Sequence, residues 1–196
     1  MIPYGRQDIT QEDIDSVIEV LQSDFLTQGP QVPAFETSIQ DYCGVDYALA
    51  VNSGTSALHV ACLALGIGPG DEVWTSPITY VASANCARYC GASADFVDID
   101  PHTYNMSVEA LAEKLKERKD SGGALPTAVI PVHLCGQSCD MEAIKALGDE
   151  YGFRIIEDAS HALGGRYSDK PIGDCRFSDM TVFSFHPVKI ITTAEG

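Results

Sequence analysis

Positive charge is scarce in this 196-residue sequence, which has 12 lysines and arginines against 28 aspartates and glutamates and a net charge of -16. Such an acidic chain is repelled by the phosphates of nucleic acids and by anionic membrane surfaces, so we expect it to bind neither. It also lacks a run of about 20 apolar residues, which a membrane-spanning helix needs, and its opening MIPYGRQDIT lacks the pattern of a signal peptide. We therefore expect a cytoplasmic protein.

The seven cysteines do not have the spacing of a disulfide framework, and their odd number fits a reducing compartment. His133, Cys135 and Cys139, or Cys86 with Cys90, are conceivable metal ligands. However, structural zinc sites generally contain two CxxC-like pairs, and these residues are separated by apolar, strand-like sequence. We expect no metal, and we expect the thiols to serve as small apolar side chains of a core.

Short apolar runs alternate with helical patterns along the chain. Strands are predicted at 47–51, 72–75, 94–97, 127–132, 155–156 and 181–185. Helices are predicted at about 10–21, 33–42, 57–65, 107–119 and 140–151, with one more that ends near residue 90. This alternation is typical of a parallel sheet with helices on both faces, so we expect a three-layer α/β domain.

The first helix has a clear start signal. Thr10 and Asp13 have the spacing of a capping box, with Asp in place of the more usual Glu. Apolar residues then follow at helical spacing, namely Ile14, Val17, Ile18 and Leu21. We expect this amphipathic helix to pack on the domain.

Lys189 follows the last predicted strand, in the stretch TVFSFHPVKIITTAEG at 181–196. A lysine at the mouth of a buried strand is partly desolvated, which favours its nucleophilic amine form. Asp158 ends the strand in RIIEDASHALG at 154–164, and His161 comes just after it. Together they suggest a Schiff-base site for pyridoxal phosphate (PLP), with the aspartate paired to the pyridinium nitrogen. Taken singly, such residues are more often a solvated surface lysine and a helix cap.

A candidate phosphate site lies upstream, where Ser53–Ser56 joins a predicted strand to a predicted helix. This geometry offers backbone N–H groups and the positive end of a helix dipole to an anion. Thr55 and Ser56 would add hydroxyl donors, although serine and threonine are also common helix caps. Because an aspartate and a lysine follow in the chain, we interpret the turn as a seat for the PLP phosphate.

Five segments resemble, in order, the motifs of the DegT/DnrJ/EryC1/StrS family of sugar-nucleotide aminotransferases: NSGTSAL, SPITYVASAN, VHLCGQSCDM, IIEDASHALG and FSFHPVKIITTAEG. The resemblance runs from about residue 3 to the end of the chain. It implies the three-layer α/β/α fold of PLP-dependent transferases (fold type I). Because family members continue well past this lysine, it also implies an N-terminal half. Residues 1–30 would form a helix and a substrate-side loop, and 31–196 an incomplete PLP-binding large domain without the C-terminal small domain.

The resemblance also implies roles for individual residues. Lys189 would be the catalytic lysine, Tyr80 would stack on the cofactor ring, and His161 would orient Asp158 or the phenolate side of the ring. Ser184 would join Thr55 and Ser56 on the phosphate. Three further residues would lie near the sugar, namely Tyr4, Thr27 and Gln28.

The implied reaction transfers an amino group from L-glutamate to C4 of a UDP-linked 4-keto-6-deoxy-N-acetylhexosamine, in a homodimer. Within the family, IPYGRQDIT, LTQGP and KIITTAEG are most similar to the pseudaminic acid branch. Three alternatives stay open. A pyridoxamine-dependent sugar dehydratase would carry histidine in place of Lys189, a sister aminotransferase would use another sugar, and a truncated remnant would be inactive. In a half-domain of this kind we expect an exposed sheet edge and a tendency to aggregate.

Overall fold

A single parallel sheet organises the computed structural model, which describes residues 5–195. Its five strands lie in the order β2-β1-β3-β4-β7. Their bounds are β1 (Glu72–Thr75), β2 (Ser93–Phe96), β3 (Ala128–Ile130), β4 (Arg154–Asp158) and β7 (Met180–Val182). A small antiparallel pair, β5 (Arg166–Tyr167) and β6 (Lys170–Pro171), stands apart from this sheet.

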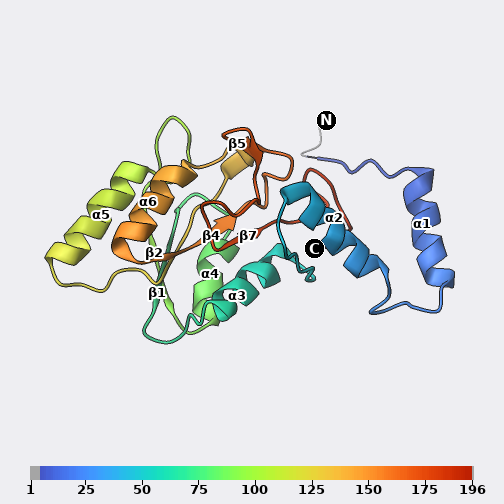
Figure 1. Ribbon diagram of the computed structural model, residues 1–196, viewed down its shortest axis with the longest axis horizontal. Helices are drawn as coiled ribbons and strands as arrows, with labels where there is room; N and C mark the ends of the chain where they lie inside the picture. Colours follow the sequence, from blue (N-terminus) through green and yellow to red (C-terminus); the bar gives the residue numbers. More distant parts are fainter. Residues whose placement is uncertain (1–4, 196) are drawn as a thin grey trace.

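Helices cover both faces of the sheet, which confirms the predicted three-layer architecture (Figure 1). Helices α3 (Gly54–Ala64) and α4 (Ala82–Tyr89) pack on one face, whereas α5 (Val108–Asp120) and α6 (Met141–Tyr151) pack on the other. The remaining helices are α1 (Gln11–Gln22), α2 (Gln31–Cys43) and the short 3-10 turn η1 (Leu134–Gly136).

The two-residue period of the strands explains this layering. In β1, Val73 packs toward α3 and α4, and the next residue, Trp74, packs toward α5 and α6. Successive strand side chains point to opposite faces, so a strand buried on both sides must be apolar at every position. The continuous apolar character of AVI at 128–130 meets this requirement, since all three residues are fully buried.

Side-chain caps begin several of the helices. The predicted capping box of α1 is present, with Asp13 N donating to Thr10 Oγ1 at 3.3 Å and Thr10 N donating to Asp13 Oδ2 at 2.8 Å. Ser107 caps α5, as predicted, by accepting from the N–H of Ala110 at 3.1 Å. Such caps satisfy N–H groups that have no partner within the helix.

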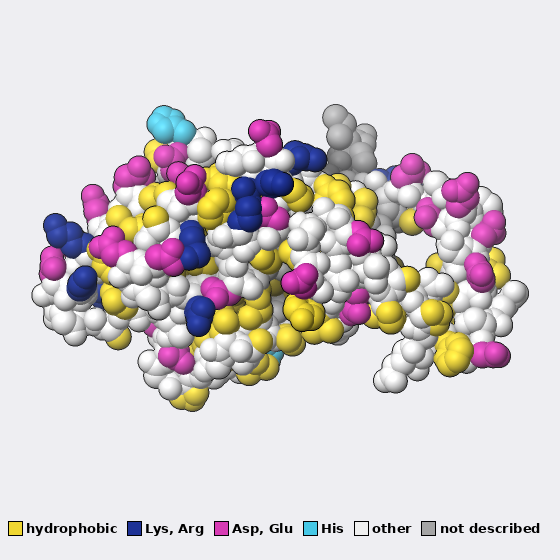
Figure 2. Space-filling model, in the orientation of Figure 1, with side chains coloured by type: hydrophobic (Ala, Val, Ile, Leu, Met, Phe, Trp, Pro, Cys, Tyr) yellow, Lys and Arg dark blue, Asp and Glu magenta, His cyan; other side chains and the backbone are white. Residues whose placement is uncertain are grey.

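The prediction that the first helix packs on the domain is wrong. Helix α1 stands away from the sheet (Figure 1) and has no buried residue. Its apolar stripe is open to solvent, with Val17 60% and Leu21 64% exposed. Apolar side chains are visible in this part of Figure 2, intermixed with acidic ones. The amphipathic pattern was read correctly as a helix, but no described element of this chain covers its apolar face.

The predicted buried strand at 47–51 is also wrong. The segment has no regular secondary structure and pairs with no strand among residues 5–195, and Tyr47 is 89% exposed. The last predicted strand, 181–185, is shorter than expected, because the chain leaves the sheet after Val182. Strand β1, by contrast, has the predicted bounds. Within the described residues, no helix has the length and apolarity required to cross a bilayer.

Candidate active site

The candidate site is a cavity of about 420 Å³ beside the carboxyl ends of β4 and β7. Open parallel sheets place their ligands at this edge, because the loops that leave the strands converge there. Six of the residues predicted from the sequence line the cavity, namely Thr55, Tyr80, Asp158, His161, Ser184 and Lys189. They come from segments separated by up to 134 positions in the chain, from Thr55 to Lys189.

The amino end of α3 forms one wall of this cavity. Ser53 caps the helix by accepting from the N–H of Ser56 at 3.1 Å, and Gly54 and Thr55 follow at the first turn. Gly54 lies close to the segment after β7, because a Cβ built on it would come within 3.2 Å of the Ser184 Cβ. The glycine therefore allows the helix end and Ser184 to approach the same space. Free N–H groups and the helix dipole make this wall favourable for an anion.

Asp158 is nearly buried, at 4% exposed, and both of its carboxylate oxygens accept hydrogen bonds. Ser83 Oγ donates to Oδ2 at 2.7 Å. Ser160 donates to Oδ1 from its hydroxyl at 2.7 Å and from its backbone N–H at 3.2 Å. These three donors hold the carboxylate in one orientation.

Lys189 is half-buried in the same cavity. Burial lowers the pKa of its amine, because the ammonium loses hydration, and the negative charge of Asp158 opposes this effect. His161 also lines the cavity, and its pKa is lowered first by burial and then by the positive charge of Lys189. Its Nδ1 accepts from the N–H of Cys135 at 3.3 Å, which places the proton of the neutral ring on Nε2. The site thus combines a half-buried amine and an imidazole, and burial lowers the pKa of both.

Not every predicted site residue reaches this cavity. The hydroxyl of Ser56 interacts with Ser53 Oγ at 3.0 Å, and Ser56 does not line the cavity. Thr27 and Gln28 are exposed and are also absent from its lining. Tyr4 lies outside the described residues. The roles of these four residues stay predictions.

Sequence reasoning missed several polar residues of the site. Ser83 lies in α4, and its hydrogen bond to Asp158 joins residues 75 positions apart, which no local pattern indicates. Ser160 is two residues beyond Asp158 and could have been identified from the Asp-x-Ser spacing, in which a serine can donate back to the carboxylate. Ser53 was included in the phosphate turn, but its capping role favours Thr55 over Ser56 as the group that faces the cavity.

The conceivable metal ligands have other roles where the structure describes them. His133 is fully buried, and its Nδ1 accepts from the N–H of Cys139 at 3.1 Å. Cys139 is buried as well, whereas Cys135 is exposed. In the range 5–195, no group of three or more His, Cys, Asp or Glu side chains is arranged to hold a metal ion.

The sheet order and the cavity at its carboxyl edge define an α/β protein whose site combines the amino end of a helix, a buried aspartate and a half-buried lysine. The chain belongs to the DegT/DnrJ/EryC1/StrS aminotransferase family, whose model matches residues 7–196. The family predicted from the sequence motifs is therefore confirmed.

Three relatives illustrate the similarity. The chain is 41% identical over 196 residues to the UDP-4-amino-4,6-dideoxy-N-acetyl-beta-L-altrosamine transaminase of Campylobacter jejuni, covering 100% of this chain and 50% of that protein. Helicobacter pylori PseC, an aminotransferase involved in the biosynthesis of pseudoaminic acid, superposes with a TM-score of 0.89 at 35% identity, covering 98% of this chain and 50% of PseC. Spr1654 of Streptococcus pneumoniae, in its PLP form, superposes with a TM-score of 0.87 at 32% identity, covering 100% of this chain and 51% of Spr1654. The chain thus spans about half the length of these relatives.

Proposed function

We propose that this chain is the cofactor-binding half of a PLP-dependent aminotransferase that acts on a nucleotide sugar. The observation that carries the proposal is the shared cavity of Lys189 and Asp158, a half-buried amine of lowered pKa and a buried carboxylate. Family membership and the similarity to a protein solved in its PLP form support it.

The residues present fit this cofactor. The cavity of about 420 Å³ lies within the range of small-molecule sites, roughly 300–1,000 Å³. Its α3 wall, with Thr55 and Ser184, would hold the phosphate, and the fixed carboxylate of Asp158 would hold the protonated ring nitrogen. Lys189 would hold the cofactor covalently through Nζ, and Tyr80, which lines the same cavity, would cover the cofactor ring.

When bound, PLP supplies an electron sink for the carbon that loses a proton. The chain supplies the proton transfers. Once free, Lys189 Nζ would accept a proton as an amine and return it as an ammonium. Because burial lowers its pKa toward neutral pH, less free energy separates the two forms there. The negative charge of Asp158 would keep the ring nitrogen protonated, and the hydrogen bonds from Ser83 and Ser160 would hold the carboxylate in place for this contact. His161, neutral and with its proton on Nε2, would help to orient these groups.

The proposed substrates are L-glutamate and a UDP-linked 4-keto-6-deoxy-N-acetylhexosamine, which would receive the amino group at C4 in pseudaminic acid biosynthesis. The similarity to the C. jejuni and H. pylori proteins supports this choice. We further propose that the whole protein is a homodimer, with Thr27, Gln28 and Tyr4 near the sugar. We place it in the cytoplasm, where its seven free thiols would stay reduced.

Covalent trapping tests the cofactor proposal. The protein is incubated with PLP, reduced with borohydride and digested, and the modified peptide is identified by mass spectrometry. We expect the label on Lys189 and its loss in Lys189→Ala, with no change in Lys170→Ala, whose side chain is exposed outside the cavity. Labelling mainly at other lysines would overturn the assignment.

Amino transfer tests the substrate proposal. The whole protein is given L-glutamate and either a UDP-linked or a GDP-linked 4-keto-6-deoxy sugar, and 2-oxoglutarate and the amino sugar are measured. We expect the UDP sugar to be used at least tenfold faster. A preference for the GDP sugar would identify a sister aminotransferase, whereas loss of the keto sugar's C3 hydroxyl without amination would identify a dehydratase.

A further inference from the structure

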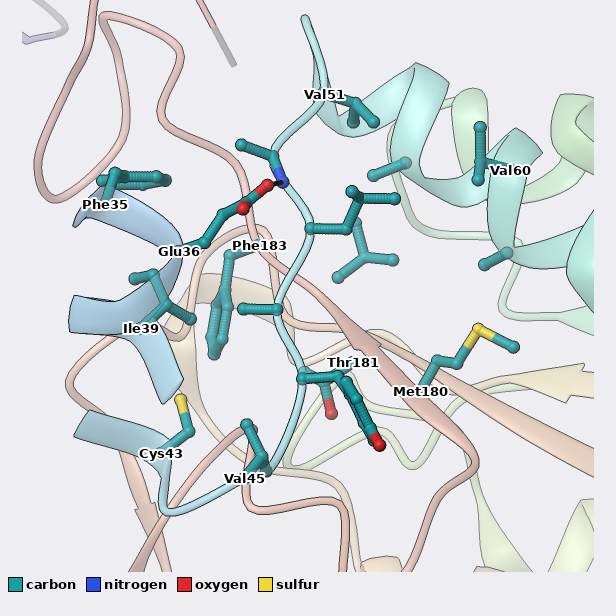
Figure 3. Close-up of a pocket in the computed structure, with 18 of the residues that line it drawn as sticks. Phe35, Glu36, Ile39, Cys43, Val45, Val51, Val60, Met180, Thr181 and Phe183 are labelled. Atoms are coloured by element: carbon teal, nitrogen blue, oxygen red, sulfur yellow. Dashed lines mark hydrogen bonds between the residues drawn. The ribbon is translucent and has the colours of Figure 1, made fainter. Parts of the chain in front are cut away.

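Two features of the described residues lie outside the cavity of the candidate site, and one of them contacts the site. An apolar groove of about 1,150 Å³ lies between β7 and the segment 45–51, with Phe35, Ile39 and Val60 in its lining (Figure 3). This groove contains none of the proposed catalytic groups. By contrast, the loop at 133–139, which follows β3, lines neither cavity but is hydrogen-bonded to a residue of the site.

The loop touches His161 at two points. The backbone N–H of Cys135 donates to Nδ1 of the imidazole at 3.3 Å. Gly136, the next residue, lies so close to the backbone of His161 that a Cβ built on it would come within 2.9 Å of the His161 carbonyl oxygen. Because Nδ1 is occupied as an acceptor, Nε2 carries the ring proton and is the nitrogen left to meet a ligand. The loop therefore makes His161 a hydrogen-bond donor toward the cavity.

The backbone of this loop is strained at the point where it donates to His161. Cys135 has a φ of +55°, in the left-handed region, and Gly136 follows with a φ of +88°. The Cβ of a residue other than glycine makes this conformation unfavourable, so it persists only where surrounding contacts enforce it. The side chain of Cys135 is exposed, and its packing therefore does not supply the restraint.

Asn105 supplies that restraint from the turn after β2. Its side chain is 3% exposed and makes three hydrogen bonds to the backbone of the loop. Nδ2 donates to the carbonyl oxygens of Gln137 and Ser138 at 3.0 and 3.1 Å. Oδ1 accepts from the N–H of Leu134 at 3.0 Å. These bonds fall on both sides of Cys135 in the chain, so they fix the two ends of the strained segment.

The turn that carries Asn105 is itself held by a carboxylate. Asp100 Oδ1 accepts from the N–H groups of His102 and Thr103 at 2.7 and 2.9 Å. The N–H of Asp100 donates to the carbonyl oxygen of Asn105 at 2.9 Å. An aspartate that bonds to the backbone a few residues ahead in this way stabilises a turn. The amide of Asn105 thus projects into the loop from a fixed support.

We propose that Asn105 is a positioning residue for His161. It holds Cys135 in the left-handed conformation, and the N–H of Cys135 then holds the imidazole with its proton on Nε2. Asn105 does not line the cavity, so it acts only through the loop. The inference rests on the proposed function in one respect, that His161 takes part in binding at this site. A group held by such outer contacts keeps the orientation that its ligand requires.

The tautomer of His161 gives a direct test. The whole protein is labelled with ¹⁵N in its histidine rings, and nuclear magnetic resonance distinguishes the protonated from the unprotonated ring nitrogen. The signal of His161 is assigned by its loss in His161→Gln. We expect the Nε2–H form in the wild type. In Asn105→Asp, which loses both N–H donors, we expect the ratio of tautomers to move about two- to tenfold toward Nδ1–H. An unchanged ratio in the folded variant would show that Asn105 serves stability alone and would overturn the proposal.

A matched pair at Cys135 tests the same contact without changing a buried residue, and it decides the matter if Asn105→Asp does not fold. Cys135→Gly keeps the N–H and removes the strain, so the tautomer of His161 should stay as in the wild type. Cys135→Val places a β-branched residue at a positive φ, which should displace the N–H and move the ratio as Asn105→Asp does. The same tautomer in both variants would contradict the proposal.

PLP binding provides a second readout. Fluorescence titration should show an affinity about two- to tenfold weaker in Cys135→Val than in Cys135→Gly, because only the glycine variant keeps His161 oriented. Equal affinities would show that the loop does not position His161 for binding. The tautomer is measured without PLP, so the positioning can fail while borohydride still traps the cofactor on Lys189. Failure of that trapping in the wild type would overturn the proposed function and leave the tautomer result intact.

Discussion

The imidazole Nε2 of His133 lies 2.8 Å from Oε2 of Glu157, and both side chains are buried on the side of the sheet opposite the candidate site. Because His133 Nδ1 accepts from the N–H of Cys139, the ring proton is on Nε2 and points to the carboxylate. The hydroxyls of Ser178 and Thr181 donate to the other oxygen of Glu157. These contacts connect the loop after β3 with β4 and β7, whose ends carry the site.

Removal of this carboxylate should destabilise the protein strongly. Glu157→Ala leaves the donors of His133, Ser178 and Thr181 without an acceptor, and we expect a loss of about 3–5 kcal/mol in the free energy of unfolding. Glu157→Gln keeps an acceptor of the same size and should cost less. Urea unfolding measures both, with the exposed Glu150→Ala as the control. A cost for Glu157→Ala no larger than that of Glu150→Ala would show that the contacts contribute nothing.

The hydrogen bond from Ser83 to Asp158 should matter for both stability and PLP binding. Ser83→Ala removes a 2.7 Å hydrogen bond to a buried carboxylate, which we expect to cost about 1.5–3 kcal/mol of folding free energy. Under the proposed function, PLP affinity, measured by fluorescence titration, should also fall because Asp158 loses its fixed orientation. Ser93→Ala, which removes a hydrogen bond on the exposed edge strand, should leave PLP affinity unchanged. Equal affinities for the two variants would exclude a positioning role for Ser83.

Gly173 should not tolerate a side chain. Its φ of +102° is unfavourable for other residues, and a Cβ there would come within 2.7 Å of Phe183 Cζ and 2.8 Å of Cys43 Sγ. Gly122 also has a positive φ, +69°, but its Cβ would meet nothing within 4 Å. We expect Gly122→Ala to cost about 1–2 kcal/mol from backbone strain alone. Gly173→Ala should cost about 1–3 kcal/mol more, from overpacking. Thermal unfolding of the two variants measures the difference, and equal costs would rule out the steric contribution.

Lys189 should react as a free amine at a lower pH than an exposed lysine, because the cavity partly buries it. Burial lowers the pKa of its amine, so Lys189 should become reactive toward an acylating reagent at a lower pH than the exposed Lys170. The negative charge of Asp158 raises this pKa, and therefore Asp158→Asn should shift the midpoint of Lys189 labelling to still lower pH. Quantitative mass spectrometry of labelled peptides across a pH series gives both midpoints. A shift to higher pH in Asp158→Asn would contradict the electrostatic account.

Local sequence determined much of the fold and part of the site. The capping box of Thr10 and Asp13, the Ser107 cap and the apolar run at 128–130 depend on neighbours within a few residues, and all were predicted. Asp158, at the end of its strand, and Lys189, after the last strand, were identified as candidates because strand ends are visible as changes from apolar to polar residues. Their motifs also sufficed to identify the family.

Only the tertiary structure decided which of these residues meet. The Ser83–Asp158 hydrogen bond and the buried His133–Glu157 contact join segments 75 and 24 residues apart, and their formation depends on the order of strands in the sheet. The amphipathic pattern of α1 correctly predicts a helix, whereas the strand-like pattern of 47–51 predicts a strand that the structure does not contain. Burial and strand pairing both require a partner element that a local pattern does not specify. Helix formation follows from the propensities of neighbouring residues. Burial and strand pairing depend on which other helices and strands pack against the segment.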